Sequence, residues 1–391
     1  MIKIAIAGIG GYGAWHLKFI KEVCEAGKAE LIAVCEPFID KYYTNLEKYN
    51  FTHVNIYKDF DDMLKNEKKI DLLDIVTPIP LHKEMFLKAS QKGLTVLLEK
   101  PPAVTIQDIN IMIAENKISG KDCFVNFQMS KCKSFMAFLK EVGKIGELKQ
   151  VTAVGMWRRD LAYFTRSYWT GKLRIGNNYI LDGATNNPFA HLLNNLLIVA
   201  NKEIESVRSE LYHANNIEGD DLSGIEIQFE DGLKANFYVT ICAKEDRIPY
   251  ILATGQNGIA KWETNGDVTV LDKKGSIIKK VSHREHMSED YYHLVIDYMN
   301  KESEIEPFRL EESRKFVLAS NLAFKSSGEI HLIEDEYKTI MGEVSPAVYN
   351  KDIENIIETV SCKNCLFSDV GIPWAKKTEK YNAENFNKFD F

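Results

Sequence analysis

The strongest constraint on the fold is the run MIKIAIAGIGGYGAWH at the start of the chain. Residues 2–7 are typical of a buried strand, and three glycines follow at the spacing G-x-G-x-x-G. The next segment, residues 15–26, places Phe19, Ile20 and Val23 on one helical face. A strand, a glycine turn and a helix in this order predict the phosphate-binding corner of a dinucleotide-binding βαβ unit.

Each glycine of the motif has a physical reason. Gly8 permits the tight turn, Gly10 lets the backbone approach a pyrophosphate, and Gly13 lets the helix pack closely on the strand. The helix N-terminus adds N–H groups and positive potential for phosphates. We expect the loop to bind the cofactor through Gly8, Ile9, Gly10, Gly11, Tyr12 and Gly13.

An acidic residue ends the second expected strand, residues 31–35. This residue, Glu36, stands about where a ribose-binding carboxylate is required. A carboxylate accepts from both ribose hydroxyls and repels a 2′-phosphate, and Pro37 and Phe38 follow rather than arginine. NAD is therefore favoured over NADP, while FAD and S-adenosylmethionine stay open on this motif alone.

Strands and helices alternate as far as about residue 127. Further strands are expected at 54–57, 72–77 and 95–99, and helices at 59–64 and 82–92. This alternation predicts right-handed βαβ units and a parallel sheet. The fold class is α/β, and residues 1–126 form a doubly wound Rossmann domain.

The pattern changes after residue 127. A helix is expected over 135–142, and alternating strand-like runs fill 149–282, with tight-hairpin signals at Asp231-Gly232 and Asn265-Gly266. Helices follow at 288–300 and 311–326. We expect an α+β domain at 127–335 with a large, mostly antiparallel open sheet, and a C-terminal extension at 336–391. Trp374 is expected to anchor this tail; the alternative is that it folds back onto the pocket or a neighbouring subunit.

The composition and net charge limit the classes of partner that the protein can have. The formal net charge of −7, without a block of Lys or Arg, argues against a nucleic-acid partner. No apolar run is long enough to span a membrane, and no signal peptide precedes the first strand, so a cytoplasmic protein is expected.

The seven cysteines include the pair CKNC at 362–365. Without a second pair or nearby histidines, this pair does not predict a metal site.

The segment TVLLEKPP at 95–102 places a lysine at the end of a parallel strand. Ligands bind at the carboxyl edge of such a sheet. Pro101 favours an extended Lys100, which would point its ammonium group into the crevice. The alternative is an exposed loop lysine.

With this segment, the chain resembles the glucose–fructose oxidoreductase/inositol dehydrogenase (Gfo/Idh/MocA) family. The matching pieces, in order, are AGIGGYG, DIVTPIPLH at 74–82, LLEKP at 97–101, KIGEL at 144–148 and FVLASNLAFKSSGEIHLI at 316–333. The resemblance implies a nicotinamide cofactor, Lys100 at the active site, and Thr77, Pro78, His82 and Glu99 close to the cofactor. It also implies a second domain whose open sheet carries substrate residues and often oligomer contacts, hence a homodimer or homotetramer.

The family's histidine corresponds to His191, in NNPFAHLLNN. Family dehydrogenases typically carry an Asp a few residues earlier, and here Asn187 stands four residues before the histidine. Asn187 followed by Pro188 predicts a helix N-cap, with Asn187, His191, Asn194 and Asn195 on a polar stripe. We expect a catalytic His191 with Asn187 in the substrate site. The alternative is a structural histidine, and an amide cannot stabilise an imidazolium as a carboxylate does.

Cations and aromatics are concentrated in MWRRDLAYFTRSYWTGKLR, residues 156–174. Arginine binds carboxylates and phosphates in a bidentate manner, and aromatic rings stack on sugars. The candidates for the substrate pocket are Arg158, Arg159, Tyr163, Arg166 and Trp169. They predict a polyhydroxylated substrate, with or without an acid or phosphate group. The alternative is a joining loop whose arginines make ion pairs and whose aromatic residues pack.

These features predict an NAD-dependent oxidoreductase acting on a sugar, sugar acid or cyclitol. His191 would take the hydroxyl proton while Lys100 hydrogen-bonds the same oxygen, or Lys100 would be the base if burial lowers its pKa. Two alternatives stay open. One is an NAD-dependent glycosidase that oxidises its substrate transiently, and the other is a non-enzymatic sensor that binds the dinucleotide as a ligand.

Overall fold

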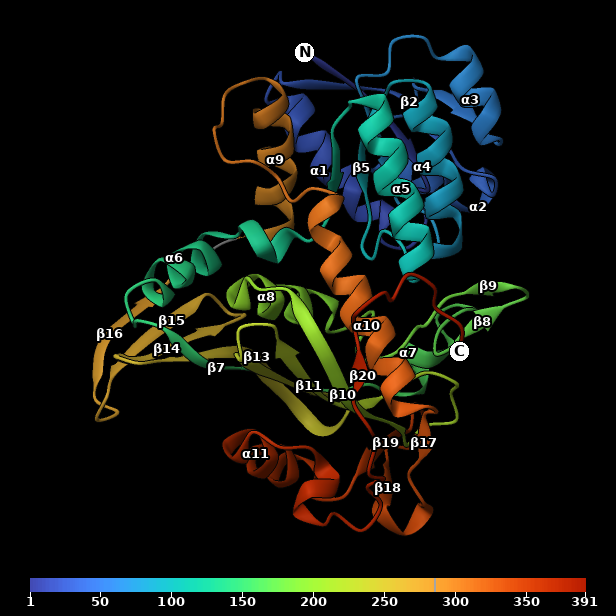
Figure 1. Cartoon of the computed structure of the whole chain (residues 1–391). Coiled ribbons are helices and arrows are strands. Elements are labelled where there is room, and N and C mark those ends of the chain that lie inside the picture. The colour runs from blue at the N-terminus through green and yellow to red at the C-terminus, as the bar shows by residue number, and fades with distance from the viewer. Residues whose placement is uncertain (285) are drawn as a thin grey trace. The chain divides into compact units, whose positions relative to one another are not determined.

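The computed structural model describes residues 1–284 and 286–391, which form two compact units (Figure 1). Unit 1 contains residues 1–103, 107–132 and 286–314. Unit 2 contains residues 104–106, 133–284 and 315–391. The predicted division at 126 and 335 differs from this mainly because residues 286–314 lie in unit 1. The three-part division of the sequence stays a proposal.

Unit 1 is built on a parallel sheet in the strand order β3-β2-β1-β4-β5-β6. The strands are β1 (Ile2–Ala7), β2 (Ala29–Cys35), β3 (Asn55–Tyr57), β4 (Leu72–Ile75), β5 (Thr95–Leu98) and β6 (Cys123–Val125). The interior positions of β4, β5 and β6 are buried and, apart from Asp74, apolar, as in a sheet covered on both faces, whereas the edge strand β3 is exposed. The order reverses between β1 and β4, and such a switch point is where α/β sheets bind ligands. The predicted Rossmann sheet is confirmed.

In the described part of the chain, unit 1 has five helices that connect these strands and a sixth from later in the chain. They are α1 (Gly13–Glu25), α2 (Ile39–Lys48), α3 (Phe60–Asn66), α4 (His82–Gln91), α5 (Ile106–Ser119) and α9 (Met287–Met299). Helix α9 belongs to this unit because two of its tyrosines reach the sheet. The hydroxyl of Tyr291 donates to the carbonyl of Val125 at 2.7 Å, and that of Tyr292 donates to the carboxylate of Asp74 at 3.2 Å.

Unit 2 is built on a ten-stranded sheet. The main path runs β16-β15-β14-β13-β7-β12-β11-β10-β17, and β20 pairs with β10. Neighbours are antiparallel except for the pairs β7–β12 and β10–β17, which confirms the predicted mostly antiparallel sheet. Both predicted hairpin turns occur: 231–232 joins β11 to β12, and 265–266 joins β14 to β15.

The strands of the large sheet are β7 (Leu148–Arg158), β10 (Ile204–His213), β11 (Leu222–Phe229), β12 (Lys234–Thr240), β13 (Cys242–Gly255), β14 (Gly258–Glu263), β15 (Asp267–Asp272), β16 (Ile277–Ser282), β17 (His331–Leu332) and β20 (Tyr381–Asn382). Two small ribbons, β8 (Arg174–Ile175) with β9 (Asn178–Tyr179) and β18 (Lys338–Met341) with β19 (Ala347–Asn350), complete the strands described. The helices are α6 (Lys133–Val142), α7 (Leu161–Thr165), α8 (Ala190–Ala200), α10 (Arg314–Ser327) and α11 (Ile353–Lys363).

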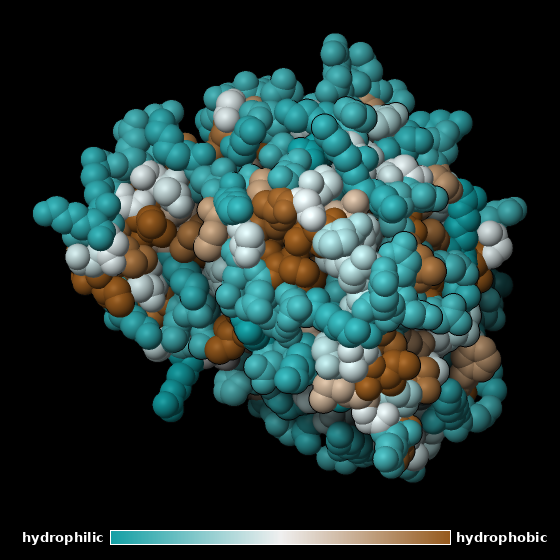
Figure 2. All heavy atoms as spheres, turned by 90° about the horizontal axis from the view of Figure 1, so that it is seen from below, coloured by the Kyte–Doolittle hydropathy of each residue, from teal (hydrophilic) through white to brown (hydrophobic). Residues whose placement is uncertain are grey.

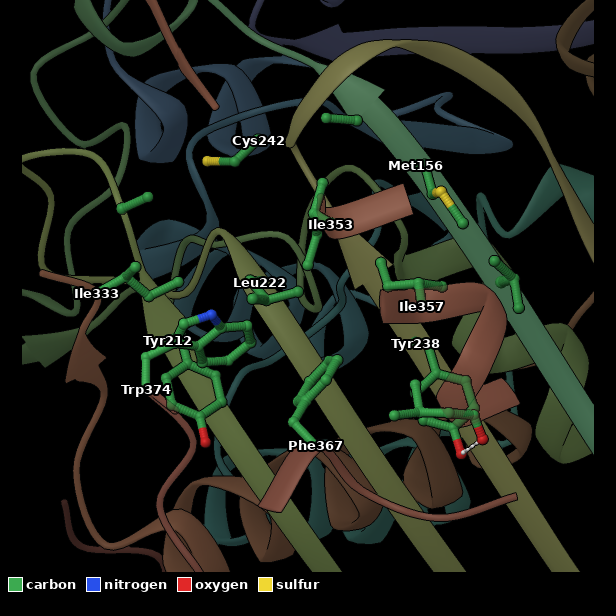
Figure 3. Packing of buried hydrophobic residues seen from close by; sticks show 14 of the residues in the cluster. Met156, Tyr212, Leu222, Tyr238, Cys242, Ile333, Ile353, Ile357, Phe367 and Trp374 are labelled. Atoms are coloured by element: carbon green, nitrogen blue, oxygen red, sulfur yellow. Dashed lines mark hydrogen bonds between the residues drawn. The ribbon is translucent and has the colours of Figure 1, made fainter. Parts of the chain in front are cut away.

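The C-terminal segment closes one face of this sheet. Figure 1 shows α6, α8 and α10 on one side of the sheet and α11 on the other. On the α11 side, Phe367 and Trp374 pack on Tyr212 of β10, with Trp374 and Tyr212 ring centroids 4.9 Å apart (Figure 3). Trp374 is buried. The predicted anchoring role of Trp374 therefore matches its packing.

The surface on the α11 side is predominantly polar. Figure 2 shows this side with apolar residues in separate patches between hydrophilic ones. The C-terminal segment thus covers the apolar face of the sheet and presents a mixed polar and apolar surface in its place. Within the described part of the chain, no helix has the length and apolar character needed to cross a bilayer.

Candidate active site

The glycine loop lies between β1 and α1, at the carboxyl edge of the parallel sheet. Gly8 has φ +91°, a left-handed conformation that favours glycine. A Cβ on Gly13 would lie 2.2 Å from the carbonyl oxygen of Gly8, so the close approach of helix and strand requires glycine there. The ring of Tyr42, from α2, lies against Gly10.

The loop offers hydrogen-bond donors for a diphosphate. No hydrogen bond found within residues 1–284 and 286–391 uses the backbone N–H of Gly10, Gly11 or Tyr12. These donors precede the first turn of α1, where the helix dipole adds positive potential. The loop therefore fits the phosphates of a dinucleotide.

Glu36 lies directly after β2 and is buried. Its Oε2 accepts from the N–H of Ile9 at 3.1 Å, and its Oε1 accepts from the N–H of Phe38 at 3.0 Å. Each carboxylate oxygen has a further lone pair, so the group retains the capacity to accept from ribose hydroxyls. The arrangement fits NAD, as the sequence predicts.

His82 connects two loops of the sheet edge. Its Nε2 lies 2.8 Å from the carbonyl oxygen of Thr77, and its Nδ1 lies 3.0 Å from that of Pro101. Burial lowers the pKa of His82, so the ring is neutral and donates to one carbonyl at a time. His82 thereby ties the loop after β4, with Thr77 and Pro78, to the loop after β5.

Lys100 follows β5 by two residues and is half-buried. Its backbone N–H donates to Oε2 of Glu99 at 3.1 Å, and its peptide bond to Pro101 is cis. Because β1, β4 and β5 are adjacent and parallel, the glycine loop, Thr77 and Lys100 share one edge of the sheet. Unit 1 therefore gathers the predicted cofactor residues and Lys100.

A buried polar cluster behind this edge was not predicted from the sequence. It consists of His16 in α1, Asp74 in β4, Glu99 after β5, Asn126 after β6 and Tyr292 in α9. Burial alone would lower the pKa of His16, but the two carboxylates outweigh it and raise that pKa to about 10. The usable sequence signal was Asp74, an acid within the apolar strand LLDI.

His191 lies in α8 of unit 2 and is buried. The predicted N-cap at Asn187 is wrong, because α8 begins at Ala190 and residues 184–189 form turns. Asn187 instead donates from Nδ2 to Oδ1 of Asp182 at 2.7 Å. Burial raises the pKa of Asp182. The Asp182 carboxylate near this helix therefore orients the Asn187 amide. It does not take the position, a few residues before the histidine, at which the family carries an Asp.

Four of the predicted substrate residues, Arg159, Tyr163, Arg166 and Trp169, form a stacked series in unit 2 with Trp157, which was not predicted. We call these five residues the arginine–aromatic row. The guanidinium carbon of Arg166 lies 3.6 Å from the Tyr163 ring centroid and 5.7 Å from that of Trp169. That of Arg159 lies 4.7 Å from the Trp157 centroid and 5.5 Å from that of Tyr163. Stacking on a ring leaves the in-plane N–H groups of an arginine directed at other partners.

The row retains positive charge. Arg159 lies 3.5 Å from a carboxylate oxygen of Asp246. Among the residues that the structure describes, the guanidinium groups of Arg158 and Arg166 form no salt bridge within 4 Å, and the backbone N–H of Arg158 donates to Oδ1 of Asp246 at 2.6 Å. The structure thus brings the five predicted residues into one region of unit 2, together with the start of α7.

Comparison with known proteins identifies the N-terminal region. Residues 2–127 match the Gfo/Idh/MocA model, described as an oxidoreductase family with an NAD-binding Rossmann fold. This part of the chain belongs to the Gfo/Idh/MocA family. The match confirms the predicted family and the predicted NAD-binding Rossmann fold.

Individual Gfo/Idh/MocA proteins are similar over longer stretches. The inositol 2-dehydrogenase of Salmonella paratyphi B is 27% identical over 150 residues, which are 38% of this chain and 43% of that protein. A glycosyl hydrolase family 109 protein of a Shewanella species is 24% identical over 200 residues, which are 47% of this chain and 42% of that protein. The chain thus matches less than half the length of these curated relatives.

A solved structure covers more of the chain. The WlbA dehydrogenase of Bordetella pertussis, in complex with NADH and UDP-GlcNAcA, superposes with a TM-score of 0.70 at 22% identity. The likeness covers 84% of this chain and 96% of that one. It shows that the fold of this chain is shared with that dehydrogenase over most of its length.

Proposed function

We propose that this protein is an NAD-dependent oxidoreductase that transfers a hydride between the nicotinamide and a hydroxyl carbon of a sugar, sugar acid or cyclitol. One observation carries the proposal. The glycine loop, Glu36 and Lys100 lie at the same carboxyl edge of a parallel sheet, in a domain of the Gfo/Idh/MocA family. The inositol 2-dehydrogenase relative supports the substrate class.

NAD, when bound, supplies a two-electron acceptor for hydride. The backbone N–H groups of Gly10, Gly11 and Tyr12 would bind its diphosphate, and Glu36 would accept from the ribose hydroxyls. The negative charge of Glu36 would repel the 2′-phosphate of NADP. The loop ahead of α1 and the end of β2 thereby set the choice of cofactor.

Lys100 and His191 would act on the reacting hydroxyl. Lys100 would donate a hydrogen bond to the hydroxyl oxygen and stabilise charge that develops there. His191 would take the hydroxyl proton as general base. Asn187, held by Asp182, is proposed as a substrate-binding amide that takes the place of the family's carboxylate.

The arginine–aromatic row, together with Arg158, is the proposed substrate-binding surface. Aromatic faces suit the C–H surface of a sugar, and the in-plane N–H groups of Arg159 and Arg166 suit a carboxylate. A polyhydroxylated substrate with an acidic group is therefore favoured. The absence of a carboxylate within 4 Å of Arg166 among the described residues supports this choice.

A homodimer or homotetramer is also proposed. The C-terminal segment covers the sheet face formed by β10, β11 and β12, so contacts between subunits would use another part of the sheet. Strand β16 is exposed along its whole length and lies at the edge, with Ile277 and Ile278 on the surface. We propose this edge as the contact.

The proposal is tested by incubating the protein with NAD and a panel of sugars, sugar acids and cyclitols. Absorbance at the NADH band and product mass are read together. We expect NADH to form with a product two mass units lighter than its substrate. Calorimetry that detects no binding of NAD would contradict the proposal, as would the absence of turnover across the whole panel.

A second candidate is an NAD-dependent glycosidase, which the family 109 relative favours. Such an enzyme would oxidise a sugar carbon with NAD, eliminate the aglycone, add water to the resulting double bond and reduce the carbonyl again with the NADH formed. A chromogenic glycoside would then be cleaved without net formation of NADH. The dehydrogenase would instead form NADH in proportion to product.

A further inference from the structure

The imidazole of His16 lies, completely buried, between two carboxylates from different strands. Its Nδ1 is 2.8 Å from Oδ2 of Asp74, and its Nε2 is 3.0 Å from Oε1 of Glu99. Asp74 lies in the interior of β4, and Glu99 directly follows β5. The histidine thus bridges two adjacent strands, and the second of them leads into Lys100.

The two carboxylate contacts, at 2.8 and 3.0 Å, favour the charged form of the ring over the longer contact of 3.4 Å from Nδ2 of Asn126 to Nε2. An ionised carboxylate oxygen only accepts hydrogen bonds, so both ring nitrogens must carry a hydrogen. A neutral ring would direct one lone pair at a carboxylate oxygen inside the protein, where unpaired polar contacts are costly. The raised pKa of His16, about 10, agrees with an imidazolium at neutral pH.

The Glu99 carboxylate connects this charge to Lys100. Its Oε1 accepts from His16 and from Nδ2 of Asn126, and its Oε2 accepts from the backbone N–H of Lys100 at 3.1 Å. The backbone N–H of Glu99 donates to the carbonyl of Ile75 at 3.0 Å. Both ends of residue 99 are therefore fixed, and the Lys100 backbone is fixed through it.

We propose that His16, as an imidazolium, is a positioning residue that acts through Glu99 on Lys100. The role of Lys100 that it serves rests on the proposed function. His16 sets both the backbone position of the lysine and the charge beside its ammonium group. This separates His16 from a residue that only fills the core.

The charges of the groups around His16 determine how its removal changes the net charge beside Lys100. The titratable groups that face His16 are Asp74, Glu99, Tyr12 and Tyr292. Burial and the Glu99 charge raise the pKa of Tyr12 to about 12, and burial raises the pKa of Tyr292, so both phenols are neutral. The cluster then carries two negative charges and one positive charge. Without the imidazolium, a second net negative charge remains beside Lys100 and favours its ammonium form.

The first test does not depend on catalysis. In the wild-type chain, NMR of the His16 ring at pH 8 is expected to show hydrogens on both nitrogens. In His16→Gln, the amide hydrogen of Lys100 is expected to exchange at least tenfold faster, because the Glu99 carboxylate is no longer clamped. His53→Gln, an exposed histidine of the same unit, serves as the matched control and leaves this exchange unchanged. A neutral His16 ring at pH 8 would overturn the proposal without any variant, and so would unchanged exchange in His16→Gln.

The second test uses the pH profile of hydride transfer. His16→Gln is expected to move the limb governed by Lys100 to higher pH, and Glu99→Gln to lower pH, each by about one unit. The double variant restores the net charge and returns the limb toward its wild-type position. If the pH limbs of His16→Gln and Glu99→Gln shifted equally in the same direction, the proposed effect of the His16 and Glu99 charges on Lys100 would be overturned. If no substrate is turned over, the proposed function fails, whereas the NMR and exchange results still decide the role of His16.

Discussion

A Cβ atom on Gly13 would lie 2.2 Å from the carbonyl oxygen of Gly8, at the point where α1 starts against the end of β1. Because this neighbour is backbone, Gly13→Ala must displace the turn itself. We expect the variant to lose at least tenfold in NAD affinity and about 1–3 kcal/mol of stability. Calorimetry with NAD and urea unfolding measure the two effects. Gly143→Ala, whose added Cβ would make ordinary contacts at 3.6 Å or more, should change neither.

Replacing Lys100 separates binding from chemistry. Lys100→Ala removes the donor to the reacting hydroxyl, and we expect kcat to fall about a hundredfold or more. The glycine loop is untouched, so NAD should bind with nearly unchanged affinity. Lys92→Ala, at an exposed lysine after α4, is the matched control. Near-normal turnover in Lys100→Ala would remove the lysine from the mechanism.

The arginine–aromatic row predicts a dependence on substrate charge. Arg166→Gln should raise KM for a sugar acid about tenfold or more, because a bidentate charge-assisted contact is lost, while KM for the matching neutral sugar changes little. Arg174→Gln offers a close control, since Arg174 also stacks on a tyrosine, Tyr179, at 4.0 Å. Equal effects of Arg166→Gln on acidic and neutral substrates would point to a packing role.

The charged state of His16 predicts how stability depends on pH. The pKa of His16 is raised from 6.5 to about 10 on folding, so its stabilising contribution is complete below about pH 6.5. It is lost as the pH rises from there to about 10. Urea unfolding at pH 6, 8 and 10 should show a decline in the wild-type protein, by a few kcal/mol at most, that is absent in His16→Gln. Parallel pH curves for the two proteins would contradict the charged state.

The packing of Trp374 predicts what the C-terminal segment contributes. Trp374→Ala leaves a cavity against Tyr212 and Phe367, and we expect a loss of about 3–5 kcal/mol in the free energy of unfolding. Loosening of the segment should also expose the sheet face and promote association, which sedimentation velocity detects. Lys380→Ala, at an exposed position in the same segment, should behave as wild type.

The cofactor domain could be predicted from the sequence because its signals are local. The glycines, Glu36 and Lys100 each stand at the end of a strand whose apolar run is short and distinct. The parallel sheet then follows from the alternation of strands and helices. Packing did not need to be known for these elements to be placed.

What sequence reasoning missed depends on contacts between distant residues. Tyr292 donates to Asp74, which is 218 positions away in the sequence. No local sequence pattern therefore indicates that α9 belongs to unit 1. The charge on His16 depends on two carboxylates that only the folded sheet brings together. The expected N-cap at Asn187 was wrong because Asp182 accepts from its side chain and residues 184–189 form turns before the helix begins.

Helix α9 has a consequence for how the chain matures during translation. The hydroxyls that Tyr291 and Tyr292 contribute to the parallel sheet leave the ribosome only after all of residues 133–284. During synthesis of residues 133–284, the nascent nucleotide-binding domain therefore lacks α9. Until α9 is made, the Asp74 carboxylate has no hydrogen bond from Tyr292. A fragment that stops at residue 127 would hold the segment that matches the family model and still lack the helix α9 that packs on its own sheet.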